Sequence, residues 1–222
     1  DTAHVHDFRV EEADWVVGQA RAVLQDLPVA AVKIGMLGSA ANARALADLL
    51  AEYPDIPAVV DPVLVAGGGD SLAAEDLGGA LCGALLPRAT VVTPNSDEAF
   101  QLTGETVPEA QADTLLRHGA HAVLLKGGHR PSEDDHVTDR LFFLDHDEQA
   151  FRHPRLPDRG YHGSGCTLST AIACALADGA APAEAIRDGL DFTFQALRAA
   201  YYPGHGQAVP DRHFRWRPEG WA

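Results

Sequence analysis

Four short apolar runs constrain the fold of this chain most strongly, because helical segments separate most of them and each ends at a polar or glycine-rich stop. The runs predicted as strands are Ala30–Ile34, Ala58–Val63, Ala89–Thr93 and Ala122–Lys126. Strands that alternate with helices indicate an α/β fold with a mainly parallel sheet. Ligands bind to such sheets at the carboxyl ends of the strands.

The segments that close these strands carry side chains suited to a binding site. They are Gly35-Met36, Asp61-Pro62, Thr93-Pro94-Asn95 and Lys126-Gly127-Gly128. Because the carboxyl ends of parallel strands meet at one edge of the sheet, we expect the four segments to line that edge together.

Apolar residues recur at helical spacing in Val10–Leu27, and six segments outside the strand runs are predicted as helices. The predicted helices are Val10–Leu27, Ser39–Glu52 (with Ser39 as N-cap), Leu72–Leu86, Ser96–Thr103, Pro108–His118 and Pro182–Tyr202. The alternating segments Val137–Leu144 and Glu148–Arg155 predict two antiparallel strands. Residues 1–202 are therefore assigned to one domain. The remaining tail, Pro203–Ala222, shows no periodicity and is either disordered or packed over the core.

Composition narrows the possible partners and the compartment. The net charge is −15, which argues against nucleic acid or an acidic membrane as a partner. No apolar run reaches the length of a membrane span. The three cysteines, Cys82, Cys166 and Cys174, show no CxxC spacing, and a reducing cytoplasm is the simplest location.

The stretch Gly163-Ser164-Gly165-Cys166 precedes a run of helix-forming residues and predicts a tight loop that opens a helix. The first turn of a helix has backbone N–H groups without intrahelical partners, and the helix dipole adds positive potential there. Such a loop forms a cradle for an anion, most often a phosphate. The same potential favours the thiolate form of Cys166. The alternative is that the glycines form only a turn that enters a buried helix.

Lysine usage singles out a possible phosphate ligand. The chain has fifteen Arg but only two Lys, Lys33 and Lys126. A lysine retained in such a chain can reflect a need for its compact ammonium group. Lys126 closes a predicted strand, so one hypothesis is that it binds phosphate. The other is that it is a surface lysine retained by chance.

Three polar residues could organise a magnesium ion near that lysine. Asp61 follows a strand, and Asn95 and Glu98 lie three residues apart at the start of a helix, on the same face. Carboxylate and amide oxygens suit Mg²⁺. Simple capping of a loop or helix explains the same residues, and for the Asn95–Glu98 pair it is the favoured explanation on the local pattern alone.

A cation, a backbone anion cradle and a lysine are the parts that phosphoryl transfer needs. The chain has neither the G-x-x-x-x-G-K-[ST] loop nor the glycine-rich loop of protein kinases.

The chain resembles the bacterial hydroxymethylpyrimidine/phosphomethylpyrimidine kinases of thiamine biosynthesis. The strings that carry the resemblance are KIGMLGSA, VVDPVLVAGGG, VVTPNSDEAFQLTG, AVLLKGGH and HGSGCTLSTAIACALADG. The resemblance runs from Asp1 to Tyr202, and HGSGCTLS is its most specific part.

This resemblance implies a ribokinase-like three-layer α/β/α sandwich with a mainly parallel central sheet. It implies that ATP phosphorylates the hydroxymethyl group of 4-amino-5-hydroxymethyl-2-methylpyrimidine, and then the monophosphate to the diphosphate. A homodimer is also implied. The implied catalytic residues are Gly163, Ser164, Gly165 and Cys166, with Cys166 as the base or as the contact to the acceptor oxygen. The other implied assignments are ATP binding by Lys126, Asn95 and Thr93, Mg²⁺ binding by Asp61 and Glu98, and a pyrimidine pocket lined by Gly35, Met36 and Val65.

The chain departs from the family pattern in three places. Relatives carry about forty further residues before Asp1, including the first strand and part of a β lid, so we expect a fragment in which Asp1–Phe8 corresponds to a lid strand. The loop Gly67-Gly68-Gly69 replaces a usual Lys and Ser, and Gly160-Tyr161 replaces a usual Asn and Thr.

Other functions compete with this one. A pyridoxal or pyridoxine kinase would use the same scaffold, and an inactive relative would keep the phosphate cradle without turnover. A hydrolase would use Cys166 as nucleophile with His162 or His129 as base, but it would leave Lys126 and Asp61 without a role. Turnover with the pyrimidine, with pyridoxal or with neither separates the kinase and binding hypotheses.

Overall fold

A computed structural model of the chain describes residues 1–64, 76–128, 135–144, 148–157 and 160–216. Six strands form one sheet in the order β1-β2-β3-β4-β5-β6. Their bounds are β1 Val32–Ile34, β2 Ala58–Val60, β3 Val91–Val92, β4 Ala122–Leu125, β5 His136–Phe143 and β6 Gln149–Pro154. The first four strands pair in parallel, whereas β5 and β6 are antiparallel additions at one edge. The mainly parallel sheet and the terminal antiparallel pair are both confirmed.

Burial explains the composition of the strands. β2, β3 and β4 are buried along their whole length, as parallel strands covered on both faces must be, and they consist of Val, Leu and Ala. β6 alternates between partly buried and exposed positions, in keeping with its place at the edge of the sheet.

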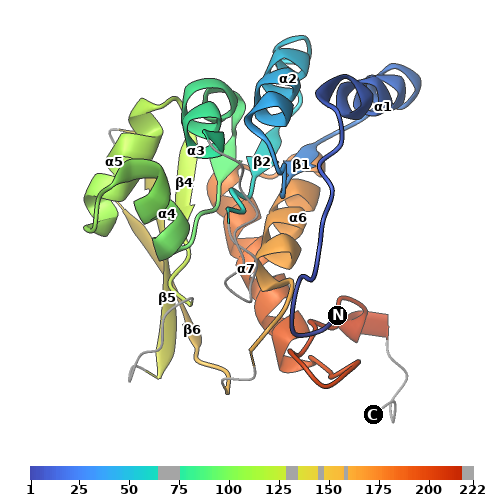
Figure 1. Cartoon of the computed structure of the whole chain (residues 1–222). Coiled ribbons are helices and arrows are strands. Elements are labelled where there is room, and N and C mark those ends of the chain that lie inside the picture. Colours follow the sequence, from blue (N-terminus) through green and yellow to red (C-terminus); the bar gives the residue numbers. More distant parts are fainter. Residues whose placement is uncertain (65–75, 129–134, 145–147, 158–159, 217–222) are drawn as a thin grey trace.

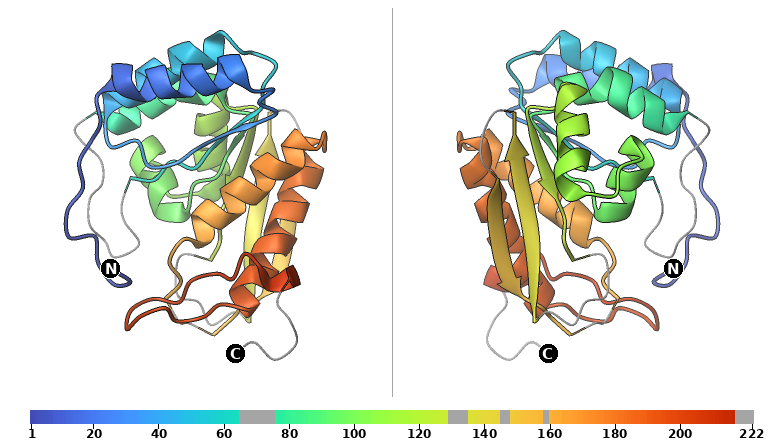
Figure 2. Two further views of the ribbon diagram at one scale, coloured as in Figure 1. Left: turned by 90° about the vertical axis from the view of Figure 1, so that its right-hand side faces the viewer. Right: turned by 90° about the vertical axis from the view of Figure 1, so that its left-hand side faces the viewer.

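Helices cover both faces of the sheet (Figures 1 and 2). The helices are α1 Ala13–Asp26, α2 Ala40–Ala51, α3 Leu77–Ala80, α4 Ser96–Thr103, α5 Pro108–Arg117, α6 Ser164–Ala177 and α7 Pro182–Arg198. One apolar core joins the sheet to α2, α3 and α5, and a second core joins the other face to α6 and α7. The result is the expected three-layer α/β/α sandwich.

Local details support the helix predictions. Ser39 is the N-cap of α2, and its Oγ accepts a hydrogen bond from the Asn42 N–H at 3.2 Å. The expected helix at Leu72–Leu86 is described from Leu77, where α3 continues into a π turn at Leu81–Leu85 and a 3₁₀ turn at Leu86–Arg88. The residues before Asp76 in that prediction lie outside the described residues.

Helices α6 and α7 approach each other closely because α7 has a glycine at the contact. A Cβ atom at Gly189 would lie only 2.6 Å from Ile172 Cγ1. Ile172 and Ile186 are fully buried between the two helices and the sheet. This contact fixes α6, whose N-terminus carries the predicted anion loop.

Both ends of the chain differ from expectation. Asp1–Phe8 forms no strand. It lies instead beside the C-terminal tail, where the Gln207 N–H donates to the Thr2 carbonyl at 2.8 Å. Helix α7 ends at Arg198 rather than Tyr202, because Tyr201 turns to pair with Val209 in an antiparallel bridge.

The tail packs against the fold as far as Trp216. Ala208 is fully buried and pairs with Tyr161, in the loop before α6. The tail therefore reaches the predicted anion loop. No helix within the described ranges has the length and apolar character needed to span a bilayer.

Candidate active site

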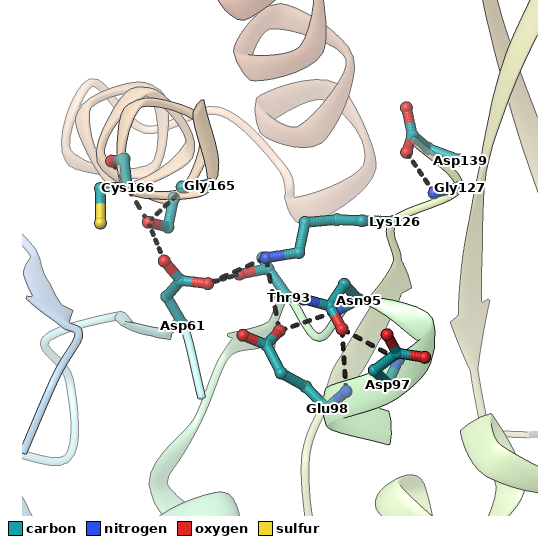
Figure 3. A network of polar contacts seen from close by, with 11 residues as sticks. Asp61, Thr93, Asn95, Asp97, Glu98, Lys126, Gly127, Asp139, Gly165 and Cys166 are labelled. Carbon is teal, nitrogen blue, oxygen red and sulfur yellow. Dashed lines mark hydrogen bonds and ion pairs between the residues drawn. The ribbon is translucent and has the colours of Figure 1, made fainter. Parts of the chain in front are cut away.

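The carboxyl ends of the parallel strands bring four of the predicted residues into one buried cluster (Figure 3). Lys126 Nζ lies 3.1 Å from Asp61 Oδ1 and 3.6 Å from Glu98 Oε2. The Thr93 hydroxyl donates to the same Asp61 oxygen at 3.3 Å. Asp61, Thr93, Glu98 and Lys126, together called the lysine cluster below, come from β2, β3, β4 and the start of α4.

Backbone hydrogen bonds between neighbouring strands hold this cluster in place. The Asp61 N–H donates to the Ile34 carbonyl, and the Lys126 N–H donates to the Pro94 carbonyl, both at 2.9 Å. Asp61 and Lys126 therefore project from strand ends that are themselves held to the neighbouring strand or strand end.

The electrostatics of the cluster keep Lys126 charged. Asp61 is 1% exposed, and the side chain of Lys126 is 15% exposed. Burial alone would lower the pKa of the Lys126 ammonium. The carboxylates of Asp61 and Glu98 more than offset this effect, so the pKa of Lys126 is raised above its usual value.

Asn95 and Glu98 cap α4 and also serve the cluster. The Asn95 side chain accepts hydrogen bonds from the Asp97 and Glu98 N–H groups, and Glu98 Oε2 accepts from the Asn95 N–H at 2.8 Å. This capping box orients Glu98 so that the same carboxylate oxygen faces Lys126. The capping explanation is therefore confirmed, and Glu98 joins the charged cluster in the same conformation.

The loop before α6 has the geometry of an anion cradle. Gly163 is the N-cap, with a φ of +82° that favours glycine, and it supplies no capping side chain. Among the residues that the structure describes, nothing caps the N–H groups of Ser164, Gly165 and Cys166. These donors and the dipole of a fourteen-residue helix are available to an anion.

This loop lies directly over the lysine cluster. A Cβ atom at Gly165 would lie 3.2 Å from Lys126 Nζ and 3.6 Å from Asp61 Oδ2. Ser169, which is fully buried in α6, places its hydroxyl 3.4 Å from Asp61 Oδ2 and 3.0 Å from the Gly165 carbonyl. A side chain at position 165 would therefore crowd Lys126, which explains the glycine there. Ser169 links α6 to the Asp61 carboxylate below it.

Sequence reasoning missed Asp139, which supports the turn after Lys126. Asp139 Oδ1 accepts the Gly127 N–H at 2.9 Å, and the residue is 6% exposed. Burial raises the pKa of the Asp139 carboxyl, and the Gly127 N–H and nearby charges only partly oppose that shift. A Cβ atom at Gly127 would lie 2.0 Å from the Thr138 carbonyl oxygen. The sequence offered one indication of this role, namely that Asp139 is a charged residue within the predicted strand Val137–Leu144.

The remaining predicted residues occupy different surroundings. Cys166 is exposed on the first turn of α6. Gly35 and Met36 follow β1 at the same edge of the sheet, and Met36 is 46% exposed. Val65 lies outside the described residues, as do Gly67-Gly68-Gly69 and His129.

The chemistry of these side chains fits a magnesium ion that arrives with a phosphate ligand. In the described part of the chain, no group of three or more His, Cys, Asp or Glu side chains is arranged to hold a metal ion. Mg²⁺ commonly takes only one or two protein carboxylates and completes its shell with water and substrate phosphates. Asp61 and Glu98, which converge on one ammonium below the anion loop, could provide those carboxylates.

The lysine cluster generates a prediction about stability. Lys126→Met should lower the free energy of unfolding at pH 7 by about 3–5 kcal/mol, because it leaves two buried carboxylates uncompensated. Urea unfolding measures this change. Lys33→Met, which replaces the only other lysine, is the matched control and should cost much less, since Lys33 forms no ion pair among the described residues.

The pH dependence has a definite sign. The pKa of Lys126 is higher in the folded than in the unfolded state, so its contribution is fully present below the usual lysine value of 10.5 and is lost as the pH rises through the folded value. The stability gap between the wild type and Lys126→Met should therefore stay constant from pH 7 to about 10 and shrink at higher pH. A gap that grows with pH would contradict the assignment.

The chain is similar to known proteins along most of its length. The family model described as phosphomethylpyrimidine kinase matches residues 1–211. The chain is 43% identical to the hydroxymethylpyrimidine/phosphomethylpyrimidine kinase of Rhizobium meliloti over 92% of this chain and 78% of that protein. It is 41% identical to the protein of the same name from Streptomyces coelicolor, over 93% of this chain and 74% of that protein.

Solved structures show the same fold. The phosphomethylpyrimidine kinase of Clostridium difficile superposes with a TM-score of 0.73 at 29% identity, over 89% of this chain and 81% of that one. The pyridoxal kinase of Staphylococcus aureus in complex with AMP-PCP and pyridoxal gives a TM-score of 0.82 at 27% identity, over 96% and 78% of the two chains. Taken together with the family match, these findings show that the chain belongs to the phosphomethylpyrimidine kinase family, a family of phosphotransferases.

Proposed function

We propose that this enzyme transfers the γ-phosphoryl group of ATP to the hydroxymethyl group of 4-amino-5-hydroxymethyl-2-methylpyrimidine, and then phosphorylates the monophosphate to the diphosphate. The observation that carries the proposal is the uncapped loop Gly163–Cys166, which lies directly over the buried Lys126–Asp61 pair. A charged transition state needs such donors and cations. The names of the relatives at 43% and 41% identity supply the substrate class.

The first transfer forms a bond between the hydroxymethyl oxygen and the γ-phosphorus and breaks the bond from that phosphorus to the β–γ bridging oxygen. The backbone N–H groups of Gly165 and Cys166 receive the transferred group at the N-terminus of α6. Cys166 stands on the first turn of that helix, where its sulfur would accept the proton of the alcohol. The Lys126 ammonium adds positive charge below the same loop.

ATP and magnesium complete the proposal. Complexes of the similar pyridoxal kinases with AMP-PCP and with ADP support ATP as the donor. Asp61 and Glu98 would hold Mg²⁺, and Asn95 and Thr93 would border the phosphates from the same strand end as the lysine cluster. When bound, the ion would neutralise charge on the phosphates.

The acceptor pocket is assigned to the β1 side of the edge. Gly35 and Met36 follow β1, and Met36 offers an exposed apolar side chain to a flat heteroaromatic ring. Val65 stays a prediction, since it lies outside the described residues. Pyridoxal is the second candidate acceptor, because the pyridoxal kinase structures superpose with TM-scores up to 0.84. Their identities of 26–28% are well below the 43% and 41% of the pyrimidine kinases from Rhizobium meliloti and Streptomyces coelicolor, so we favour the pyrimidine as acceptor.

We also propose a homodimer in the cytoplasm. Helix α1 has no buried residue, and it exposes Trp15 (64%) and Val23 (49%), which a second copy would cover. Sedimentation velocity should give a mass near twice 23.6 kDa. Trp15→Glu should shift the measured mass towards that of the monomer, and a wild-type monomer would contradict the proposal.

The proposed location in the cytoplasm rests on the free thiols of Cys82, Cys166 and Cys174, which suit a reducing compartment. Cell fractionation can check this location.

The catalytic proposal is tested by turnover of ATP with the pyrimidine alcohol and with pyridoxal. The wild type should prefer the pyrimidine. Cys166→Ser should lower kcat by about 10²–10⁴-fold while leaving the Kd of an ATP analogue nearly unchanged, because the backbone cradle and Lys126 remain. Cys174→Ser, an exposed cysteine on the same helix, is the matched control and should behave like the wild type.

Three outcomes would count against this assignment. Loss of ATP-analogue binding in Cys166→Ser would mean that the cysteine holds the nucleotide. Preference for pyridoxal would move the chain to the second candidate acceptor. Nucleotide binding without turnover of either acceptor would identify an inactive phosphate-binding relative.

A further inference from the structure

The C-terminal tail brings a second cation to the anion loop. Arg212 Nε donates to Thr167 Oγ1 at 3.0 Å, and the Thr167 hydroxyl donates to the Gly163 carbonyl at 2.7 Å. A Cβ atom at Gly163 would lie only 3.0 Å from Arg212 Nη2. The guanidinium therefore lies against the first residue of the loop, in an orientation fixed by a buried threonine.

The tail around Arg212 is anchored, so this position is well defined. The Asp211 N–H donates to the Ala196 carbonyl in α7 at 2.9 Å, and Asp211 is 3% exposed. The Ala208 N–H donates to the Gly160 carbonyl at 2.9 Å, which ties the tail to the segment that leads into the loop.

Arg212 differs from Lys126 in its charge environment. Lys126 is paired with two carboxylates, whereas Arg212 forms no ion pair with any carboxylate in the ranges that the structure describes. The sequence has 32 acidic and 17 basic residues, so an arginine without an acidic partner is unexpected at this position. Within residues 1–64, 76–128, 135–144, 148–157 and 160–216, its side chain bonds through Nε only, which leaves the two terminal nitrogens of the fork for an anionic ligand.

Arg212 also lies on the same side of the loop as Cys166. The two residues, with Thr167, Phe192 and Arg215, border a groove of about 820 Å³ between α6, α7 and the tail. Asp178, Asp188 and Asp191 also line this groove, and none of them pairs with Arg212 in the described part of the chain. Neither Lys126 nor Asp61 lines this groove. The loop therefore has one neutralised cation on the sheet side. Near Cys166, the residue proposed to contact the acceptor oxygen, it has a second cation without a carboxylate partner among the described residues.

We infer that Arg212 binds the phosphate group of the monophosphate acceptor and thereby favours the second phosphorylation. This inference rests on the proposed function and extends it to one residue. In that second step an oxygen of the acceptor phosphate bonds to the γ-phosphorus of ATP, the bond to the β–γ bridging oxygen breaks, and ADP leaves. An acceptor phosphate in its dianionic form, which predominates above a pH of about 6, has no proton to transfer.

The two phosphorylations differ in their need for a cation on the acceptor side. The alcohol is neutral, so its approach to the γ-phosphate meets no charge repulsion. The monophosphate brings like charges close together, and a guanidinium beside the acceptor offsets that repulsion. Removing the Arg212 charge should therefore affect one acceptor far more than the other.

Steady-state kinetics with both acceptors test the inference. Arg212→Gln should raise KM for the monophosphate about 10- to 100-fold, the loss expected for charge-assisted hydrogen bonds. It should leave KM and kcat for the alcohol within about twofold of the wild type. Arg212→Lys should recover part of the monophosphate affinity. Arg198→Gln, an exposed arginine at the end of α7, is the matched control and should change neither acceptor.

Calorimetric binding of the monophosphate without ATP separates a binding role from a structural one. Affinity should fall in Arg212→Gln, and the thermal unfolding midpoint should stay close to that of the wild type. Equal losses with both acceptors, or no loss with either, would overturn the inference. A wild-type enzyme that turns over neither acceptor would refute the proposed function itself, before any variant of Arg212 is considered.

Discussion

The buried interaction of Lys126 with Asp61 and Glu98 is the constraint on which the rest of this site depends. It joins the ends of β2 and β4 to the start of α4, and Ser169 extends it to α6. One ammonium between two nearly buried carboxylates is stable only when all three are in place. This interaction therefore holds three elements in one arrangement: the sheet, the capping box of α4 and the first turns of α6. The uncapped loop Gly163–Cys166 lies directly above the ammonium.

The loop Gly163–Cys166 lies between two cations, Lys126 and Arg212, whose charge environments differ. Below it, Lys126 is neutralised by its carboxylates, so the lysine cluster as a whole is acidic and suits a metal ion carried by a nucleotide. On the other side, Arg212 keeps its positive charge and faces the groove that also contains Cys166. The two surroundings fit the two reactants of a phosphoryl transfer, a nucleotide that brings magnesium and an acceptor that is neutral at first and anionic afterwards.

The sequence was most informative where local chemistry and burial agree. Continuous Val, Ala and Leu runs predicted β2, β3 and β4, and the N-cap Ser39 and the glycine loop before Cys166 were visible because their geometry is local. Contacts between distant segments were not visible. Nothing in the spacing of the tail indicates that Arg212 reaches Gly163, because that contact depends on a bridge between Tyr161 and Ala208, 47 residues apart, and on the end of α7 at Arg198. The dual role of Glu98 likewise follows from the tertiary position of Lys126, since the local pattern predicts only a cap.

The most direct test of the account is a crystal structure of the protein with a non-hydrolysable ATP analogue and Mg²⁺. The account predicts that oxygens of the γ-phosphate lie about 3 Å from the backbone nitrogens of Gly165 and Cys166, with the Lys126 ammonium on the sheet side of the same phosphate. A γ-phosphate bound elsewhere, with the Gly163–Cys166 loop in contact with no phosphate, would contradict it.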